Sequence, residues 1–112
     1  MREDILQQID QQIDVEKVRV ARGEALDRLQ KNKDFQLIVL DGYLRNEAIR
    51  LVGLRGEPAL ARPDTQASIL RDIDAIGSFG QYLRTVHAGA EQASKVIAQA
   101  EEERQAVLEE NS

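Results

Sequence analysis

The amino-acid sequence predicts an all-α protein of three helices, at about residues 2–31, 34–54 and 65–110. Apolar residues recur at helical spacing along most of the chain, the middle segment is apolar on two sides, and the last segment carries a heptad repeat. We expect a helical hairpin followed by a long, coiled-coil-like C-terminal helix. The length of 112 residues predicts a single domain, 1–112.

The composition indicates narrow seams between helices rather than a large aromatic core. Aromatic residues make up only 4% of the chain and Trp is missing, so the core must be aliphatic and rich in Ala. Without Cys, neither disulfides nor thiolate metal sites can form. The sequence has no run of about 18 apolar residues, and its N-terminus, MREDILQQID, has no apolar signal core. We therefore expect neither a membrane span nor a secretion signal.

The first predicted helix, 2–31, changes its apolar face part-way along. Ile9 and Ile13 share one stripe, whereas Leu26 and Leu29 lie on nearly the opposite side. Gly23, a poor helix former, lies close to the change. Either the helix kinks near Gly23, or it runs straight and contacts different partners with its two halves.

The second predicted helix, 34–54, has two apolar faces. One face carries Leu37, Leu40, Leu44, Ala48 and Leu51, and the other carries Phe35, Ile38, Val39 and Ile49. Because a surface helix needs only one apolar stripe, we expect this helix to be sandwiched as the middle layer of a helical assembly. Either Asn32 or Asp34 caps it. Gly42, inside it, indicates a close helix contact or a small kink.

A loop predicted at 55–64 separates this helix from the third, because Gly and Pro residues interrupt the pattern there. The third helix carries a heptad seam of Ile76, Phe79, Leu83, Val86, Ala90, Ala93 and Ile97. The second helix is too short to cover the distal half, so the first helix or another copy must bury it. We expect this heptad seam to form an oligomer or partner interface. Its small residues, with Gly77, Gly80 and Gly89, favour close backbone approach.

Charge is distributed unevenly along the chain. The net charge is −5, yet the ten basic and six acidic residues from Lys17 to Arg62 give that span +4. The basic candidates for contact with nucleic acid or an acidic partner are Lys17, Arg19, Arg22, Arg28, Lys31 and Lys33. The last stretch, 101–112, is an acidic tail whose charges oppose the helix dipole. We expect it to be solvated or to meet a basic partner.

No pattern in the sequence indicates catalysis or a cofactor. His87 is the single histidine, and Glu91 lies one turn further along, a pairing typical of a helix surface. We find no phosphate-binding glycine loop, no nucleophile–base spacing and no cluster of metal ligands. The sequence therefore predicts a protein that is not an enzyme and that has no catalytic, cofactor-binding or metal site.

Two segments together carry a resemblance to a known class of proteins. NKDFQLIVLDGYLRNEAIRL, followed by ILRDIDAIGSFGQYLRTV, resembles small all-helical virion or DNA-packaging accessory proteins of tailed bacteriophages, over residues 32–86. The resemblance implies a protein made in the bacterial host cytoplasm and incorporated into virions or used in DNA packaging. Small terminase subunits, ring-forming helical proteins that recognise viral DNA, are one such class. This sequence departs from them because it lacks a clear DNA-binding helical domain.

Three functional hypotheses follow from these patterns. The favoured one is a structural or assembly protein that acts through helix–helix contacts, as a phage head, portal/neck or packaging accessory, and forms a homo-oligomer or binds portal, capsid or packaging proteins. The first alternative is a nucleic-acid-binding packaging subunit that uses the six basic residues. The second is an acidic inhibitor that occupies a site on a host protein.

Overall fold

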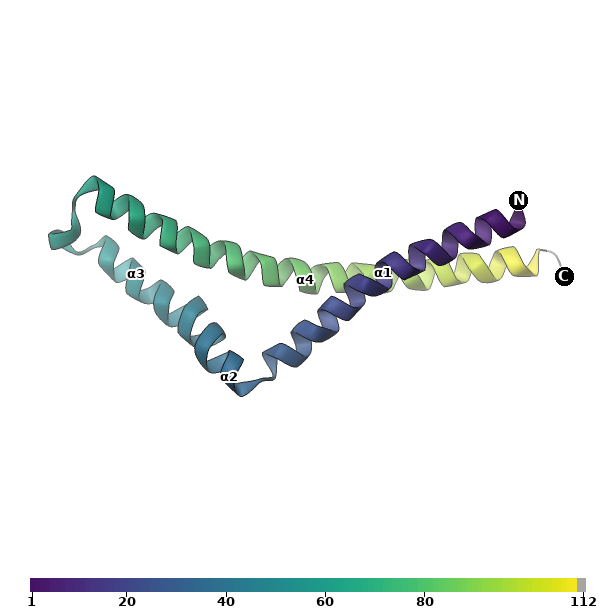
Figure 1. Cartoon of the computed structure of the whole chain (residues 1–112), viewed down its shortest axis with the longest axis horizontal. Helices are drawn as coiled ribbons and strands as arrows, with labels where there is room; N and C mark the ends of the chain where they lie inside the picture. Colours follow the sequence, from purple (N-terminus) through teal and green to yellow (C-terminus); the bar gives the residue numbers. More distant parts are fainter. Residues whose placement is uncertain (111–112) are drawn as a thin grey trace. The chain divides into compact units, whose positions relative to one another are not determined.

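A computed structural model describes residues 1–110, and every secondary-structure element in that part is helical (Figure 1). The elements are α1 (Arg2–Gln30), α2 (Lys33–Phe35), the π-helix η1 (Gln36–Glu47), α3 (Ala48–Arg55), the 3-10 turn η2 (Pro58–Leu60) and α4 (Pro63–Glu109). α2, η1 and α3 follow one another without a break, so they occupy the place of the second predicted helix. The predicted all-α fold with a long C-terminal helix is confirmed.

The ends of these helices are fixed by identifiable side chains. The Oδ1 atom of Asn32 accepts a hydrogen bond from the backbone N–H of Phe35 at 3.0 Å, so Asn32 rather than Asp34 caps the second helical run. Pro58 starts η2 and Pro63 starts α4, positions at which the missing N–H of proline costs no helical hydrogen bond. The connection between α3 and α4 therefore falls within the predicted loop.

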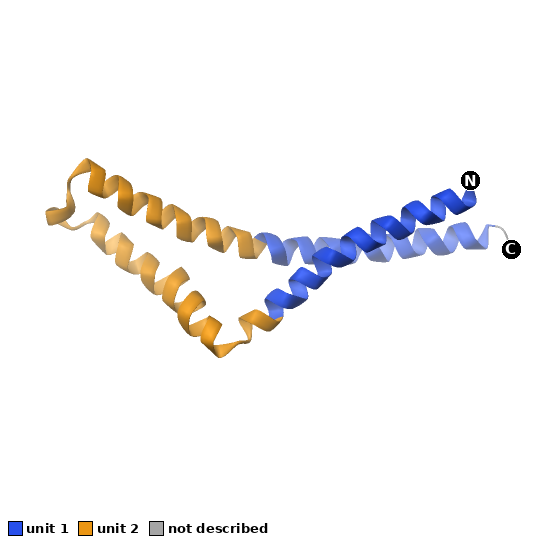
Figure 2. Ribbon diagram, viewed as in Figure 1, with its two compact units in different colours: residues 1–27, 85–112 blue, residues 28–84 orange. Residues whose placement is uncertain are grey.

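The chain divides into two compact units, which are coloured separately in Figure 2. Unit 1 comprises Met1–Asp27 and the chain from Thr85 onward, and unit 2 comprises Arg28–Arg84. Each unit contains parts of two long helical runs and has an apolar cluster of its own. We describe the units separately.

In unit 1, α1 packs against the C-terminal half of α4. Ile9, Ile13 and Ala100 are buried together, and Ile97 packs on this cluster. Across the same helix pair, the Nε atom of Arg104 donates a hydrogen bond to Oδ1 of Asp10 at 2.9 Å. Both partners are about half-exposed, so we expect the ion pair to add little stability beyond the apolar contacts.

α1 and α4 approach each other closely at Gly23. A Cβ atom placed on Gly23 would lie 2.2 Å from the Cβ of Ala90, far inside van der Waals contact. α1 runs through this position as one continuous α-helix, from Arg2 to Gln30. The close approach predicted for small residues of α4 is therefore found at Ala90, whereas Gly77 and Gly89 have open space around them.

In unit 2, the second helical run packs against the N-terminal half of α4. The buried residues Leu51, Ile69 and Ile76 form its cluster, with Leu44 and Ile73 packed around them. The rings of Tyr43 and Phe79 meet edge-to-face, with centroids 6.0 Å apart, a favoured aromatic geometry. Leu44, Ala48 and Leu51, from one of the two predicted apolar faces, therefore pack against α4.

The middle of this run is wound as a π-helix rather than as an α-helix. π-Helical segments are rare and usually span a single turn, yet η1 covers 12 residues. A Cβ atom on Gly42 would lie 2.9 Å from the carbonyl oxygen of Leu37, five residues earlier in the same run. Glycine at position 42 thus avoids a clash with the backbone of its own π-helix. It does not mark a close contact with a neighbouring helix, which was one of the two expectations from the sequence.

We expect Gly23→Ala to destabilise the protein, although alanine is the better helix former by about 1 kcal/mol. The added methyl group would overlap that of Ala90, and overpacking of this kind typically costs about 1–3 kcal/mol. Thermal unfolding followed by circular dichroism should show a lower Tm. The matched control is Gly89→Ala, also helical and in unit 1 but with nothing within 4 Å, which should raise Tm.

The double variant Gly23→Ala with Ala90→Gly removes the overlapping methyl group and should recover part of the loss. A Gly23→Ala variant as stable as Gly89→Ala would show that the two helices separate at this point without cost.

Candidate helix–helix interaction site

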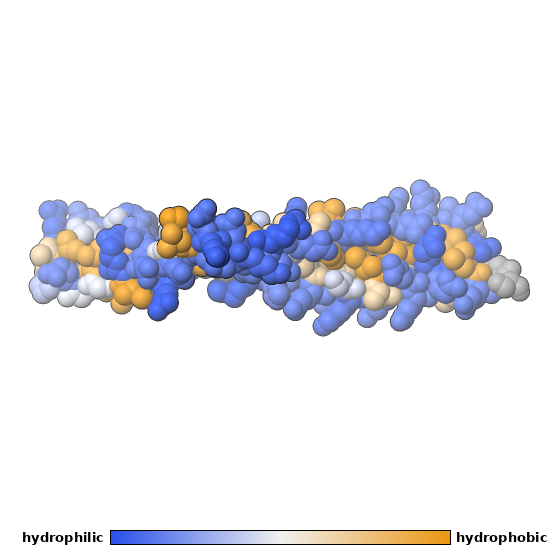
Figure 3. All heavy atoms as spheres, turned by 90° about the horizontal axis from the view of Figure 1, so that it is seen from below, coloured by the Kyte–Doolittle hydropathy of each residue, from blue (hydrophilic) through white to orange (hydrophobic). Residues whose placement is uncertain are grey.

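An uncovered aliphatic surface lies on the second helical run, on the side that α4 does not cover. Leu37, Ile38, Ile49 and Val52 are between 62% and 67% exposed. We call these four residues the exposed aliphatic face. Figure 3, which views the molecule from below, shows apolar side chains reaching the surface among hydrophilic ones. Exposed aliphatic side chains grouped on one element are typical of surfaces that bind another protein.

This surface corrects part of the sequence-based expectation. Leu37 lies on the same predicted face as Leu44 and Leu51, which belong to the cluster packed with α4, but Leu37 itself is exposed. Ile38 and Ile49, on the second predicted face, are exposed as well, whereas Phe35 and Val39 are half-buried. The predicted second neighbour of this helix is therefore not supplied by the part of the chain that the structure describes.

Four residues of this run, spaced four apart, form what we call the exposed row: Leu37, Asp41, Arg45 and Ile49, all of them exposed. In an α-helix such residues drift around the axis by about 40° at each step. With the wider π winding, at roughly 4.4 residues per turn, each step falls about 30° short of a full turn instead. The α-helical winding resumes at Ala48, so the step from Arg45 to Ile49 adds almost no drift. The whole row drifts by about 60°, which is half of the roughly 120° expected in an α-helix. The four side chains therefore stay on one side.

The charges beside the exposed row are already neutralised, while those within it are not. Nε of Arg50 donates hydrogen bonds to both carboxylate oxygens of Glu47, at 3.1 and 3.0 Å. The hydrogen bond from Arg50 lowers the pKa of the Glu47 carboxyl below its ordinary value. Asp41 and Arg45 make no ion pair within residues 1–110. The row therefore offers one free acid and one free base between two aliphatic residues.

The unit 2 part of the predicted heptad seam contacts the second helical run. Ile76 is buried in the cluster with Leu51, and Phe79 meets Tyr43. Leu83, near the end of this unit, is half-buried. The first residues of the seam thus have partners within the chain.

The unit 1 part of the seam is also engaged within the chain. Ala90 meets Gly23, Ala93 is completely buried, and Ile97 packs on the Ile9 cluster. Val86 is half-buried. The first helix therefore covers the distal seam, one of the two arrangements that the sequence left open. Exposed aliphatic side chains are found on η1 and α3, and also on α1, where Val15 is 61% and Val18 53% exposed.

All six basic residues predicted to contact nucleic acid or an acidic partner are exposed: Lys17, Arg19 and Arg22 in unit 1, and Arg28, Lys31 and Lys33 in unit 2. Arg19 lies 3.7 Å from the carboxylate of Glu16, and the other five make no ion pair in the described chain. The three in unit 2 surround the junction between α1 and α2, where Asn32 caps the second run.

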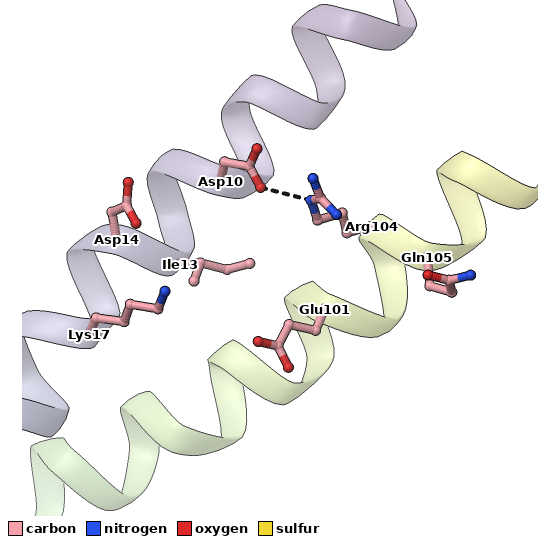
Figure 4. Close-up of a pocket in the computed structure, with 7 residues that line it drawn as sticks. All are labelled: Asp10, Ile13, Asp14, Lys17, Glu101, Arg104 and Gln105. Carbon is pink, nitrogen blue, oxygen red and sulfur yellow. Dashed lines mark hydrogen bonds and ion pairs between the residues drawn. The ribbon is translucent and has the colours of Figure 1, made fainter.

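A polar groove lies between α1 and α4 in unit 1 (Figure 4). It is lined by Asp10, Ile13, Asp14, Lys17, Glu101, Arg104 and Gln105. Asp10 and Arg104 are bonded to each other across it, whereas Asp14, Lys17 and Glu101 make no ion pair in the described chain. Because the groove brings acidic and basic side chains together, it does not present charge of a single sign to a ligand.

A second groove in unit 1 contains the single histidine. Nε2 of His87 lies 3.1 Å from Oε1 of Glu91, the pairing that the sequence spacing predicted, and Glu24 and Asp27 line the same groove. Among residues 1–110, no group of three or more His, Cys, Asp or Glu side chains could hold a metal ion. The predicted acidic tail is helical as far as Glu109, and residues 111–112 lie outside the described part.

No helix in the described chain is both long enough and apolar enough to cross a bilayer. Comparison with protein families, curated proteins and solved structures found no match to this chain. The candidate site must therefore be argued from its own geometry.

The π-helix is the feature of this site that the sequence analysis missed. We expect Gly42→Ala to destabilise unit 2, because its methyl group would meet the Leu37 carbonyl oxygen. Gly53→Ala is the matched control, since Gly53 lies in α3 of the same run with nothing within 4 Å. The control should gain up to about 1 kcal/mol of helix stability. Thermal unfolding should therefore give a lower Tm for Gly42→Ala and a higher Tm for Gly53→Ala. An equal rise in Tm for both variants would show that the π-helix converts to an α-helix without a loss of stability.

Proposed function

We propose that this chain is a non-enzymatic assembly protein that works through helix–helix contacts at the exposed aliphatic face. The observation that carries the proposal is the exposure of Leu37, Ile38, Ile49 and Val52 on a helix whose opposite side is already packed. Complete burial of one such side chain contributes about 1.5–3 kcal/mol. Four of them supply enough apolar surface to drive association with another helical surface.

The resemblance over residues 32–86 gives this proposal its biological setting. We propose a head, portal/neck or packaging accessory of a tailed bacteriophage, acting in the bacterial host cytoplasm or in the virion. The exposed aliphatic face lies inside the stretch that carries the resemblance. The partners implied are other copies of the chain or portal, capsid and packaging proteins.

A second candidate function is binding of nucleic acid in packaging. It is supported by Arg28, Lys31 and Lys33, three exposed basic residues without ion pairs in the described chain, gathered within six positions at the α1–α2 junction. Basic side chains bind phosphate groups without reading sequence. We place it second because the net charge of −5 opposes approach to a polyanion.

The assembly function is tested by photo-crosslinking in the cells that naturally make the protein. A photoreactive amino acid in place of Ile49 should give discrete adducts of higher mass, because this side chain would lie in the contact. The control position is Ser78, which is exposed on α4 in the same unit and should give none. Absence of adducts at position 49, with the protein present at normal levels, would contradict the proposal.

The nucleic-acid function is tested by fluorescence anisotropy with duplex DNA. If it holds, affinity should fall steeply between about 50 and 200 mM salt, because counterions are released on binding. Replacement of Arg28, Lys31 and Lys33 by Gln should then weaken binding about tenfold or more, while the same change at Arg71 should have little effect. No binding at low salt would exclude this candidate.

A further inference from the structure

We propose that the exposed row joins two copies of this chain, with the two η1–α3 runs lying antiparallel about a two-fold axis. The proposal rests on the assembly function above and deepens it, because it names the partner and the register. It involves residues of unit 2 alone, all of them exposed in the single chain.

The order of residues in the exposed row is self-complementary. Leu37, Asp41, Arg45 and Ile49 follow one another at equal four-residue intervals, so the row reads apolar, acidic, basic, apolar. When a second copy is turned about an axis at position 43, Asp41 comes opposite Arg45 of the other copy, and Leu37 comes opposite Ile49. A two-fold interface always uses one patch on both subunits, so each of these contacts occurs twice.

The charges favour this orientation over the parallel one. In a parallel pair, Asp41 would face Asp41 and Arg45 would face Arg45, and such like-charge contacts are unfavourable. The wider distribution of charge agrees, since the first half of the run carries two acids and one base (Asp34, Asp41 and Lys33) and the second carries three bases and one acid (Arg45, Arg50, Arg55 and Glu47). Two antiparallel helices also place the positive N-terminal end of each dipole beside the negative C-terminal end of the other, which is favourable.

Val52, one α-helical turn after Ile49 and 62% exposed, extends the apolar part of this contact beyond the row. A contact between two single helix faces is nevertheless small compared with standard stable interfaces. We therefore expect a concentration-dependent equilibrium between monomer and dimer, rather than a permanent dimer.

The register is tested by reversing the two charges separately and together. Asp41→Arg puts arginine opposite arginine in both symmetry-related contacts, and Arg45→Asp puts aspartate opposite aspartate. Each single reversal should weaken dimerisation about tenfold or more at low salt. The double variant restores both opposite-charge contacts and should recover the wild-type dimerisation constant. Sedimentation equilibrium of the full chain, from about 10 µM to 1 mM, measures all four proteins.

Matched controls are available on α4 in the same unit. Arg71→Asp and Asp74→Arg reverse exposed charges that lie outside the row, and neither should change the dimerisation constant. Circular dichroism verifies that each variant keeps its helical content. If a reversal unfolds the chain, Ile49→Gln replaces it, and this variant should weaken the dimer by removing the apolar contact.

The outcomes separate this inference from the proposed function. Recovery in the double variant supports the antiparallel register, whereas single reversals without effect, or a double variant that stays weak, overturn it. A wild-type chain that remains monomeric up to about 1 mM also overturns it. If the crosslinks at position 49 then join a different protein, the assembly function stands with another partner; if they are absent too, both proposals fail.

Discussion

The helical run from Lys33 to Arg55 carries more apolar surface than one neighbouring helix can cover, and this constraint organises unit 2. Leu44, Ala48 and Leu51 pack with α4, which leaves the exposed aliphatic face on the other side. A monomeric protein would ordinarily place polar residues there, because exposed aliphatic side chains favour association. The run therefore has a second apolar side that no part of the described chain covers.

The π winding determines which residues lie together on the uncovered side. An α-helix would spread Leu37, Asp41, Arg45 and Ile49 over about a third of its circumference, and the wider turn narrows that spread. Gly42 makes the winding compatible with the run, since a side chain there would collide with the carbonyl of Leu37. Long π-helices are uncommon because their geometry is less favourable, so an arrangement that depends on one indicates a functional reason for the position of these side chains.

Much of the fold could be predicted from the sequence, because helical periodicity, capping residues and prolines act locally. The heptad pattern identified α4, and Asn32 and Pro63 indicated helix ends within one or two residues. Periodicity could not assign the partner of each face. The heptad seam meets Gly23 and Ile9 of α1 and Leu51 of α3, and such choices depend on how helices far apart in sequence come together. Gly42 is visible in the sequence as an unusual residue inside a helix. The α-helical spacing of 100° per residue, however, does not place Leu37, Asp41, Arg45 and Ile49 on one side, because the run is wound as a π-helix.

Within the exposed row, aliphatic and charged residues contribute in different ways. Leu37 and Ile49 supply apolar area, which favours contact with any apolar surface of suitable shape. Asp41 and Arg45 remain hydrated in the single chain and oppose contacts that leave them without a partner, so they restrict binding to a surface that presents the opposite charges at matching positions. A helix with aliphatic residues alone on this side would associate in many registers. The central pair of Asp41 and Arg45 limits the register. Because the acid precedes the base, a second copy that runs in the opposite direction places its base opposite the acid of the first copy, and its acid opposite the base.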